Sequence, residues 1–182
     1  MGSNGAAGSD RIVGKAQGLY LGWRKIGNPQ HKFSRRTDFA LPMRGTGPLE
    51  KPQSLMSEPT VAVLGASQDR RKYGNKAVRA YREHGMNVVP VNPREATVEG
   101  LTAYPNLDVI TVPLDYVSLY VPPAVGRQLL PAIAAKSPKE VWLNPGSESD
   151  ELIEAAADLG LRTITACSIV ALGLSPAEFP DT

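Results

Sequence analysis

The stretch Val61-Ala-Val-Leu-Gly-Ala-Ser67, followed by Lys72-Tyr-Gly-Asn75 and Val88-Val-Pro-Val-Asn-Pro-Arg94, decides the fold of this 182-residue chain. An apolar run ends at a glycine, a helix is expected to begin within about a dozen residues, and a second apolar run follows. This order is typical of the first half of a nucleotide-binding βαβ unit. Backbone N–H groups at such a turn and helix start have no partner within the helix. They therefore form a site for an anion such as a pyrophosphate.

Alternating apolar runs and helical segments extend this unit to the rest of the chain. Because strands that alternate with helices form parallel sheets with right-handed crossovers, the sequence predicts a Rossmann-like, doubly wound α/β fold of three layers and about five strands. The expected strands are 60–64, 87–91, 116–121, 140–143 and 162–166. The expected helices are 75–83 with Asn75 as N-cap, 124–130, a second segment from Pro131 to Lys136, and 150–159 capped by Ser147 or Ser149. We expect 101–114 to be a connection with at most one helical turn.

The composition changes abruptly near Met56. Residues 1–55 hold 9 Lys and Arg against 3 Asp and Glu, whereas the remainder holds 11 against 15. The first part is also rich in Gly and Pro and lacks a sustained apolar period, so it cannot bury enough surface to offset the entropy of ordering. We therefore predict a basic, mostly disordered extension over 1–55 and one domain over 56–182.

Three explanations of this extension stay open. It could be a translated upstream stretch, with Met56 as the natural start. It could be an organelle transit peptide, because it contains Arg and few acids. It could also be a nucleic-acid-binding arm, because three cations between residues 32 and 36 surround Phe33. A tail with scattered charge is more often solvated, so nucleic acid is the less expected partner.

Several classes of protein are not supported by the sequence. No apolar run approaches the roughly 18 residues that span a membrane, and no secretory apolar segment follows Met1. Cys167 is the only cysteine, so no internal disulfide can form and a reducing, cytoplasmic setting is expected, or an organelle if 1–55 is a transit peptide. His31 and His84 have no cysteine partners at zinc-site spacing, so we expect no metal site.

Ligands of open parallel sheets bind at the carboxyl ends of the strands. Gly65 permits the close approach of a phosphate, Ser67 offers a hydroxyl donor, and Lys72 with Arg70 or Arg71 can neutralise its charge. The alternative is that Gly65 only ends a strand and that Lys72 is only a solvated surface charge. The other ends in the predicted sheet are Asn92-Pro93-Arg94, Pro122-Pro123, Asn144-Pro145-Gly146 and Cys167-Ser168.

The loop after the first strand also distinguishes among nucleotides. A nicotinamide–adenine site usually has G-x-G-x-x-G and an acid at the end of the second strand. Here Ser67 and Arg70 replace the later glycines, and Asn92 stands in place of the acid, with Arg94 two residues on. An Arg without an acid favours a phosphorylated ribose, as in NADP or the 3′-phosphate of coenzyme A, although Arg94 could simply face solvent.

Taken together, the motifs resemble the CoA-binding domain family, which comprises small Rossmann-like proteins similar to the N-terminal domain of succinyl-CoA synthetase α subunits. The resemblance runs from about Thr60 to Leu174, and the extension has no counterpart in it. Asn144 departs from the glutamine that is common before the Pro-Gly pair of this family. The motifs that carry the resemblance are Gly65-Ala-Ser67, Lys72-Tyr-Gly-Asn75, Pro90-Val-Asn-Pro93, Tyr104-Pro105, Pro122-Pro123, Val141-Trp-Leu-Asn-Pro-Gly146 and Cys167.

The resemblance implies a place for each part of coenzyme A. The pyrophosphate would be held by Gly65, Ala66, Ser67 and Lys72. The adenosine end would be lined by Asn92, Pro93 and Arg94. The pantetheine arm would be bordered by Pro122 and Pro123, with Asn144, Pro145 and Gly146 beside it.

The expected function is binding of coenzyme A or an acyl-CoA, without catalysis by this chain. No nucleophile with an adjacent base is visible in the sequence. Cys167 is either a small core residue or a thiol that meets the thiol of bound CoA and forms a mixed disulfide by exchange. The alternatives are an NAD(P)-binding oxidoreductase and a regulatory subunit that reports CoA level or redox state to a protein partner.

Overall fold

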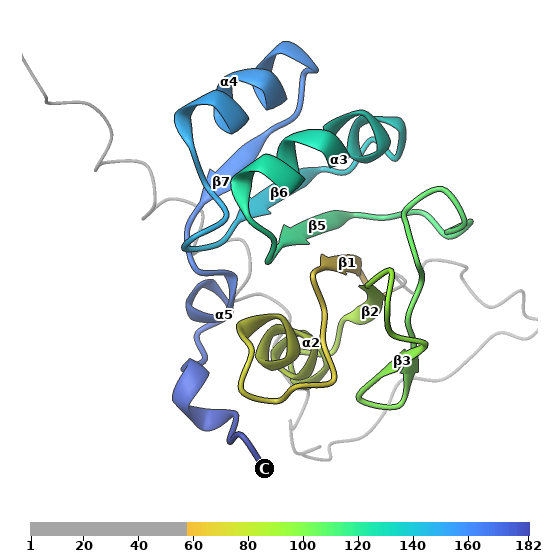
Figure 1. Ribbon diagram of the computed structural model, residues 1–182. Helices are drawn as coiled ribbons and strands as arrows, with labels where there is room; N and C mark the ends of the chain where they lie inside the picture. The colour runs from red at the N-terminus through yellow and green to blue at the C-terminus, as the bar shows by residue number, and fades with distance from the viewer. Residues whose placement is uncertain (1–57) are drawn as a thin grey trace, which may run out of the picture. The chain divides into compact units, whose positions relative to one another are not determined.

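Five parallel strands form the central sheet of the computed structural model, which describes residues 58–182 (Figure 1). Their order across the sheet is β2-β1-β5-β6-β7, and every neighbouring pair is parallel. This confirms the expected Rossmann-like α/β fold. The strands are β1 (Thr60–Leu64), β2 (Asn87–Val91), β5 (Tyr116–Leu119), β6 (Glu140–Leu143) and β7 (Thr163–Thr165).

Helices cover the two faces of this sheet (Figure 1). The helices α2 (Tyr73–Glu83) and α5 (Ser168–Ala171) pack together on one face, and α3 (Pro123–Ala135) and α4 (Asp150–Asp158) pack together on the other. The chain winds from β1 to β2 in one direction and from β5 to β7 in the other. The strand order therefore reverses between β1 and β5, which is the place where open α/β sheets bind ligands.

The core lies mainly between the sheet and the pair α3 and α4. All four residues 61–64 of β1 are at most 1% exposed, which fits a central strand covered on both faces. Side chains from β5, β6, α3 and α4 fill the layer above it, and the largest of them are Leu119, Leu130, Ile133, Leu143 and Leu152.

The outer edge of β2 is extended by a short piece of chain. The N–H of Tyr104 donates to the carbonyl of Pro90 at 2.9 Å, and the N–H of Asn92 donates to the carbonyl of Tyr104 at 2.9 Å. Tyr104 thus forms an isolated parallel bridge with Val91.

Two expected helix boundaries were wrong. Helix α2 begins at Tyr73 with Lys72 as N-cap, so Asn75 lies inside the first turn. Its side chain is fully buried and bonds elsewhere, which a capping pattern in the sequence does not distinguish. Helix α3 runs unbroken through Pro131, which was expected to start a new segment. The strands expected at 116–121 and 162–166 are also shorter at their ends.

A small hairpin that the sequence did not predict ends at the start of 101–114, the segment expected to be a connection. It pairs β3 (Thr97–Val98) with β4 (Leu101–Thr102) in antiparallel register. Glu99 and Gly100 form its turn, with φ values of 48° and 78°, as a tight primed turn requires. A 3-10 turn at Pro176–Glu178 precedes the last residues.

The expectations for the extension over 1–55 lie outside the described residues. From residue 58 onward, none of the helices has the length and apolar character needed to cross a membrane.

Two glycines allow three backbones to meet at the end of β1. Gly65 has a φ of +87°, and a Cβ built there would lie 2.4 Å from the carbonyl oxygen of Tyr120. A Cβ built on Gly74, in the first turn of α2, would lie 2.2 Å from the carbonyl oxygen of Gly65. Gly74 therefore supplies the close helix-to-strand packing that the third glycine of G-x-G-x-x-G provides in dinucleotide-binding folds.

We predict that Gly74→Ala lowers the free energy of unfolding by about 3 kcal/mol, because the new methyl group collides with backbone that cannot move aside. In an unobstructed helix the same change would be stabilising by about 1 kcal/mol. Urea unfolding of the full chain measures the difference. The control is Gly85→Ala, where nothing lies within 4 Å and only the positive φ of 81° opposes the change. It should cost about 1 kcal/mol, and an equal or smaller loss for Gly74→Ala would contradict the steric account.

Candidate functional site

The sequence-predicted site residues follow the strand ends and therefore lie along one edge of the parallel sheet. Asn92 links two of these loops. Its Nδ2 donates to the carbonyl of Ala66 at 2.6 Å, and its Oδ1 accepts from the N–H of Arg94 at 2.8 Å. The loop after β2 is therefore fastened to the loop after β1, while Pro93 and Arg94 stay exposed.

The loop after β1 already holds an oxyanion from its own chain. The buried hydroxyl of Ser67 donates to Oε1 of Glu95 at 3.0 Å, and the N–H of Gln68 donates to Oε2 of the same carboxylate. Glu95 was not among the predicted site residues, because the acid of nicotinamide sites was expected at Asn92, three positions earlier. An acid soon after the second strand was the available signal.

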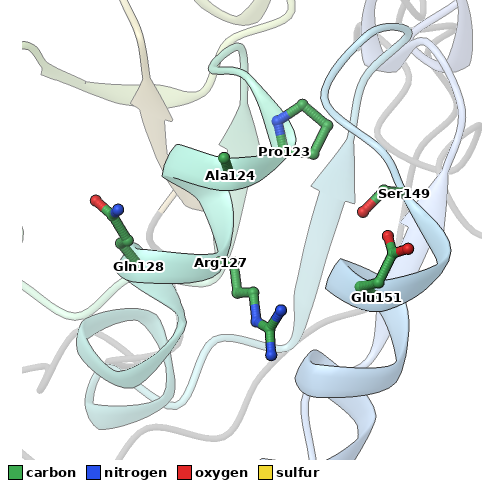
Figure 2. A pocket seen from close by; sticks show the side chains of 6 residues that line it. All are labelled: Pro123, Ala124, Arg127, Gln128, Ser149 and Glu151. Atoms are coloured by element: carbon green, nitrogen blue, oxygen red, sulfur yellow. The ribbon is translucent and has the colours of Figure 1, made fainter.

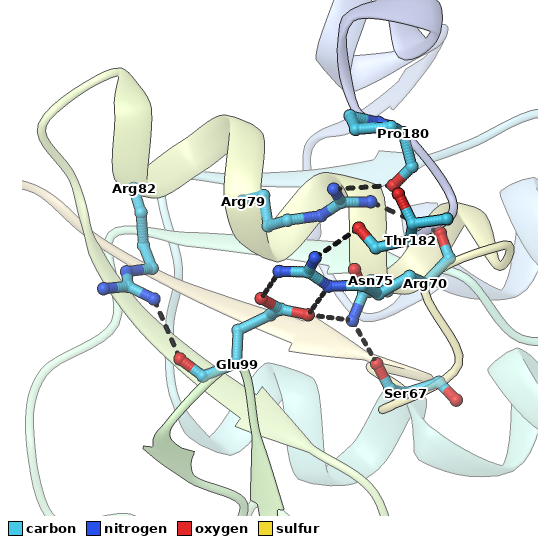
Figure 3. Close-up of polar contacts among 8 residues, drawn as sticks. All are labelled: Ser67, Arg70, Asn75, Arg79, Arg82, Glu99, Pro180 and Thr182. Atoms are coloured by element: carbon cyan, nitrogen blue, oxygen red, sulfur yellow. Dashed lines mark hydrogen bonds and ion pairs between the residues drawn. The ribbon is translucent and has the colours of Figure 1, made fainter.

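Two of the cations expected at this loop are occupied by carboxylates. Arg70 forms a bidentate pair with Glu99, at 2.9 Å from Nε to Oε1 and 2.7 Å from Nη2 to Oε2 (Figure 3). Arg71 pairs with Asp69 at 2.9 Å. The hydrogen bond from Arg70 lowers the pKa of Glu99 to about 2, and that from Arg71 lowers the pKa of Asp69 to about 2.

Lys72 differs from both arginines. Its side chain is exposed, and it forms no ion pair within residues 58–182. It is also the N-cap residue of α2, whose first turn carries no acidic side chain and no side-chain capping bond. The positive end of this helix and the Lys72 ammonium thus lie together beside the loop after β1.

Asn75 and the last residues of the chain hold this loop through hydrogen bonds (Figure 3). Nδ2 of Asn75 donates to the carbonyl of Ser67 at 2.7 Å and to Oε1 of Glu99 at 2.9 Å. Arg70 also donates to the main-chain oxygen of Thr182, and Arg79 donates to the carbonyl of Pro180 at 2.9 Å.

The same terminal segment is held by two further contacts. Lys76 pairs with Asp181 at 2.8 Å, and the guanidinium of Arg79 lies 5.5 Å from the ring centre of the buried Phe179. These contacts fix residues 179–182 against α2.

A groove lies beside Pro123, between the first turns of α3 and α4 (Figure 2). Its volume is about 570 Å³, and Arg127 and Glu151 face it from the two helices. Ser149 caps α4 by accepting from the N–H of Leu152 at 3.2 Å, which confirms one of the two expected capping residues. The complete lining is Pro123, Ala124, Arg127, Gln128, Ser149 and Glu151.

Asn144 is fully buried, and its amide is used inside the protein. Nδ2 donates to Oγ of Ser118 at 2.9 Å and to the carbonyl of Leu119 at 3.0 Å, and Oδ1 accepts from the N–H of Ser168 at 2.8 Å. This one side chain therefore joins β5, β6 and the start of α5. Only the neighbouring Pro145 and Gly146 are exposed at this loop.

Cys167 is half-buried at the N-cap position of α5. It lies near the buried Tyr81 and the half-buried Tyr120. Burial raises the pKa of Tyr81 to about 12 and raises the pKa of Tyr120, and the proximity of Cys167 adds to both shifts. The hydroxyl of Tyr120 lies 2.9 Å from Oγ of Ser168. Both readings of Cys167, as a core residue or as a thiol beside a ligand, stay predictions.

Metal ligands do not gather anywhere between residues 58 and 182: no three His, Cys, Asp or Glu side chains there are placed to hold an ion.

We predict that Asn144→Ala lowers the free energy of unfolding by about 3 kcal/mol, because it leaves buried partners on three segments without their hydrogen bonds. Denaturant unfolding provides the measurement. Asn87→Ala is the matched control, since it removes an exposed amide with one bond to the carbonyl of Glu58 at 3.0 Å. It should cost less than about 1 kcal/mol, and similar losses for both variants would argue against the buried network.

We predict that Glu99→Gln makes the free energy of unfolding depend less on pH in the acidic range. Arg70 lowers the pKa of Glu99 in the folded chain from 4.5 to about 2. Its stabilising contribution is therefore complete above the ordinary pKa and is lost as the pH falls from about 4.5 toward 2. Unfolding measured between pH 7 and pH 2 tests this, with the exposed Glu83→Gln as control. An unchanged pH dependence in Glu99→Gln would refute the assignment.

Comparisons with known proteins show what this chain is similar to. The chain is 32% identical over 115 residues to the alpha subunit of ADP-forming acetate–CoA ligase II from Pyrococcus furiosus, a match that covers 57% of this chain and 25% of the relative. The chain thus spans about a quarter of that protein's length.

In two solved structures the match covers a larger share of the other chain. A conserved hypothetical protein from Pyrococcus furiosus has a TM-score of 0.56 and 29% identity, over 62% of this chain and 97% of that one. A protein from Thermus thermophilus has a TM-score of 0.58 and 32% identity, over 63% and 87%. The family model described as the CoA binding domain matches residues 59–173, more than half of the sequence. The chain therefore belongs to the family of CoA-binding domains.

Proposed function

We propose that this chain binds coenzyme A or an acyl-CoA, with the pyrophosphate at the loop after β1 and the start of α2. The observation that carries the proposal is the carboxylate of Glu95 on the hydroxyl of Ser67 and the N–H of Gln68. These donors converge on two oxygens of one anionic group, which is the arrangement that a phosphate needs.

The distribution of charge at the loop supports the same placement. Lys72 is exposed at the N-cap of α2 and forms no ion pair in the described domain, so it is available to a phosphate. Arg94 is exposed on the neighbouring loop, where Asn92 fixes its backbone. In the proposal Arg94 lies beside the 3′-phosphate of the adenosine.

The groove beside Pro123 suits the pantetheine arm. It begins at the carboxyl end of β5, one strand away from the loop after β1, and combines the apolar Pro123 and Ala124 with polar side chains. The arm would pass Pro122 and Pro123 toward the exposed Pro145 and Gly146, with Cys167 on the next strand end. Asn144 would support this path through its internal bonds rather than by direct contact.

We further propose that the chain supplies binding rather than chemistry and that a partner protein completes any reaction. The relative named as a ligase subunit is about four times as long as the matched segment. The second candidate function is a regulatory or targeting subunit for such a partner. Affinity purification of the full chain, with and without CoA, tests it: an enzyme recovered in constant ratio supports it.

The first test is a thermal melt of the full chain with CoA, acetyl-CoA, NAD, NADP and ATP in parallel. A ligand at 100 times its dissociation constant stabilises the folded state by about 2.7 kcal/mol, which corresponds to a shift of several degrees. We expect the shift with CoA and acetyl-CoA. A shift with NADP and none with CoA would favour the oxidoreductase alternative.

We predict that Lys72→Ala raises the dissociation constants of CoA and 3′,5′-ADP by similar factors of about ten, since both ligands present a phosphate to the same charge. The unliganded melting temperature should hardly change, because the side chain is exposed. Lys139→Ala is the control. It removes the same charge just before β6, at the amino ends of the strands, and should leave CoA affinity within about twofold. Equal CoA binding by Lys72→Ala and the unaltered chain would remove Lys72 from the site.

A further inference from the structure

We propose that Glu95 is a resident counter-anion of the loop after β1 and that it sets the affinity of this loop for phosphate. An incoming phosphate must displace the Glu95 carboxylate from the hydroxyl of Ser67 and the N–H of Gln68. This inference deepens the proposed function, on which it rests for the identity of the ligand.

The position of Glu95 is fixed by the backbone on both sides. Asn92 ties the loop after β2 to the carbonyl of Ala66 at 2.6 Å, so residue 95 is carried to the loop after β1. On the far side, Nε2 of Gln68 donates to the carbonyl of Thr97 at 2.8 Å and lies 3.3 Å from its Oγ1. Segment 95–97 and Gln68 are thus joined at both ends, and the carboxylate is held over the loop rather than reaching it by chance.

Glu95 uses both of its oxygens on this loop. Oε1 accepts from Ser67 at 3.0 Å, and Oε2 accepts from the N–H of Gln68. A phosphate accepts hydrogen bonds through the same kind of paired oxygens. Each of these two protons can serve only one strong acceptor, so the phosphate and the carboxylate compete for them. If Glu95 stayed in place, its negative charge would still oppose the phosphate.

Glu95 is also the acid of this region whose charge no cation neutralises. Glu99 is paired with Arg70, and Asp69 with Arg71. Glu95 forms no ion pair with any residue between 58 and 182. Its charge is balanced by the loop's own donors, so loss of that charge changes the anion site without breaking an ion pair.

The test is Glu95→Gln, which keeps the length of the side chain and one oxygen acceptor but removes the charge. Isothermal titration of the full chain with inorganic pyrophosphate should give a dissociation constant about tenfold lower in Glu95→Gln. Glu154→Gln, an exposed charge on α4, is the control and should stay within about twofold of the unaltered chain. Equal or weaker pyrophosphate binding by Glu95→Gln, or none by either chain, overturns the inference.

A spectroscopic readout follows the displacement directly. The amide proton of Gln68 should shift upfield in ligand-free Glu95→Gln, because its acceptor loses the full charge. In the unaltered chain the same resonance should move when pyrophosphate is added. A Gln68 resonance that responds to neither change contradicts the exchange of one anion for the other.

A parallel titration with CoA separates this inference from the proposed function. Tighter pyrophosphate binding by Glu95→Gln with no CoA binding by either chain would leave the counter-anion standing and reject CoA as the ligand. CoA binding of equal strength in both chains, with equal pyrophosphate binding, would leave the function standing and reject the role of Glu95.

Discussion

The close contact of three backbones at the end of β1 is the constraint on which the rest of the structure depends. Gly65 touches the carbonyl of Tyr120 and Gly74 touches the carbonyl of Gly65, so the loop after β1, the start of α2 and the end of β5 share one position. Any side chain at either glycine would separate them. Because the loop cannot move away from the sheet, the donors at Ser67 and Gln68 are oriented before any ligand arrives. Such preorganisation lowers the entropy that binding must overcome.

The charged side chains around the loop after β1 are of two kinds, those in ion pairs and those without. Carboxylates neutralise the two arginines nearest the loop, and the pairing of Arg70 with Glu99 ties the hairpin of β3 and β4 to the terminal residues. Lys72, Arg94 and Glu95 remain as charges that form no ion pair in the described domain. In the proposed function the cations attract a phosphate and Glu95 competes with it, so the affinity would depend on the balance between these side chains.

Local signals made the fold predictable from the sequence. Apolar β-branched runs that end at Gly65, Asn92 or Asn144 mark buried strands, and Ser149 before two acids marks the start of α4. The hairpin of β3 and β4 has strands of two residues, which are too short to show a period. The roles of Glu95 and Asn144 depend on partners that lie 24 to 28 positions away in the sequence. The sequence placed Asn144, but not Glu95, at the carboxyl ends of the strands. No spacing rule distinguishes an amide or carboxylate that faces a ligand from one that bonds to its own chain.

The covered edge of β2 limits how another protein can join this domain. Pro90 has no N–H to offer, and the segment at Tyr104 already occupies the main-chain groups beside it. A partner that adds a strand to this sheet would therefore find few free main-chain groups at the Pro90 end of β2 and only three residues at β7. Edge-to-edge pairing between copies, to which exposed edge strands are prone, is thus disfavoured at these positions. The helices and loops of residues 58–182 therefore offer a protein partner more accessible groups than the edges of the sheet do.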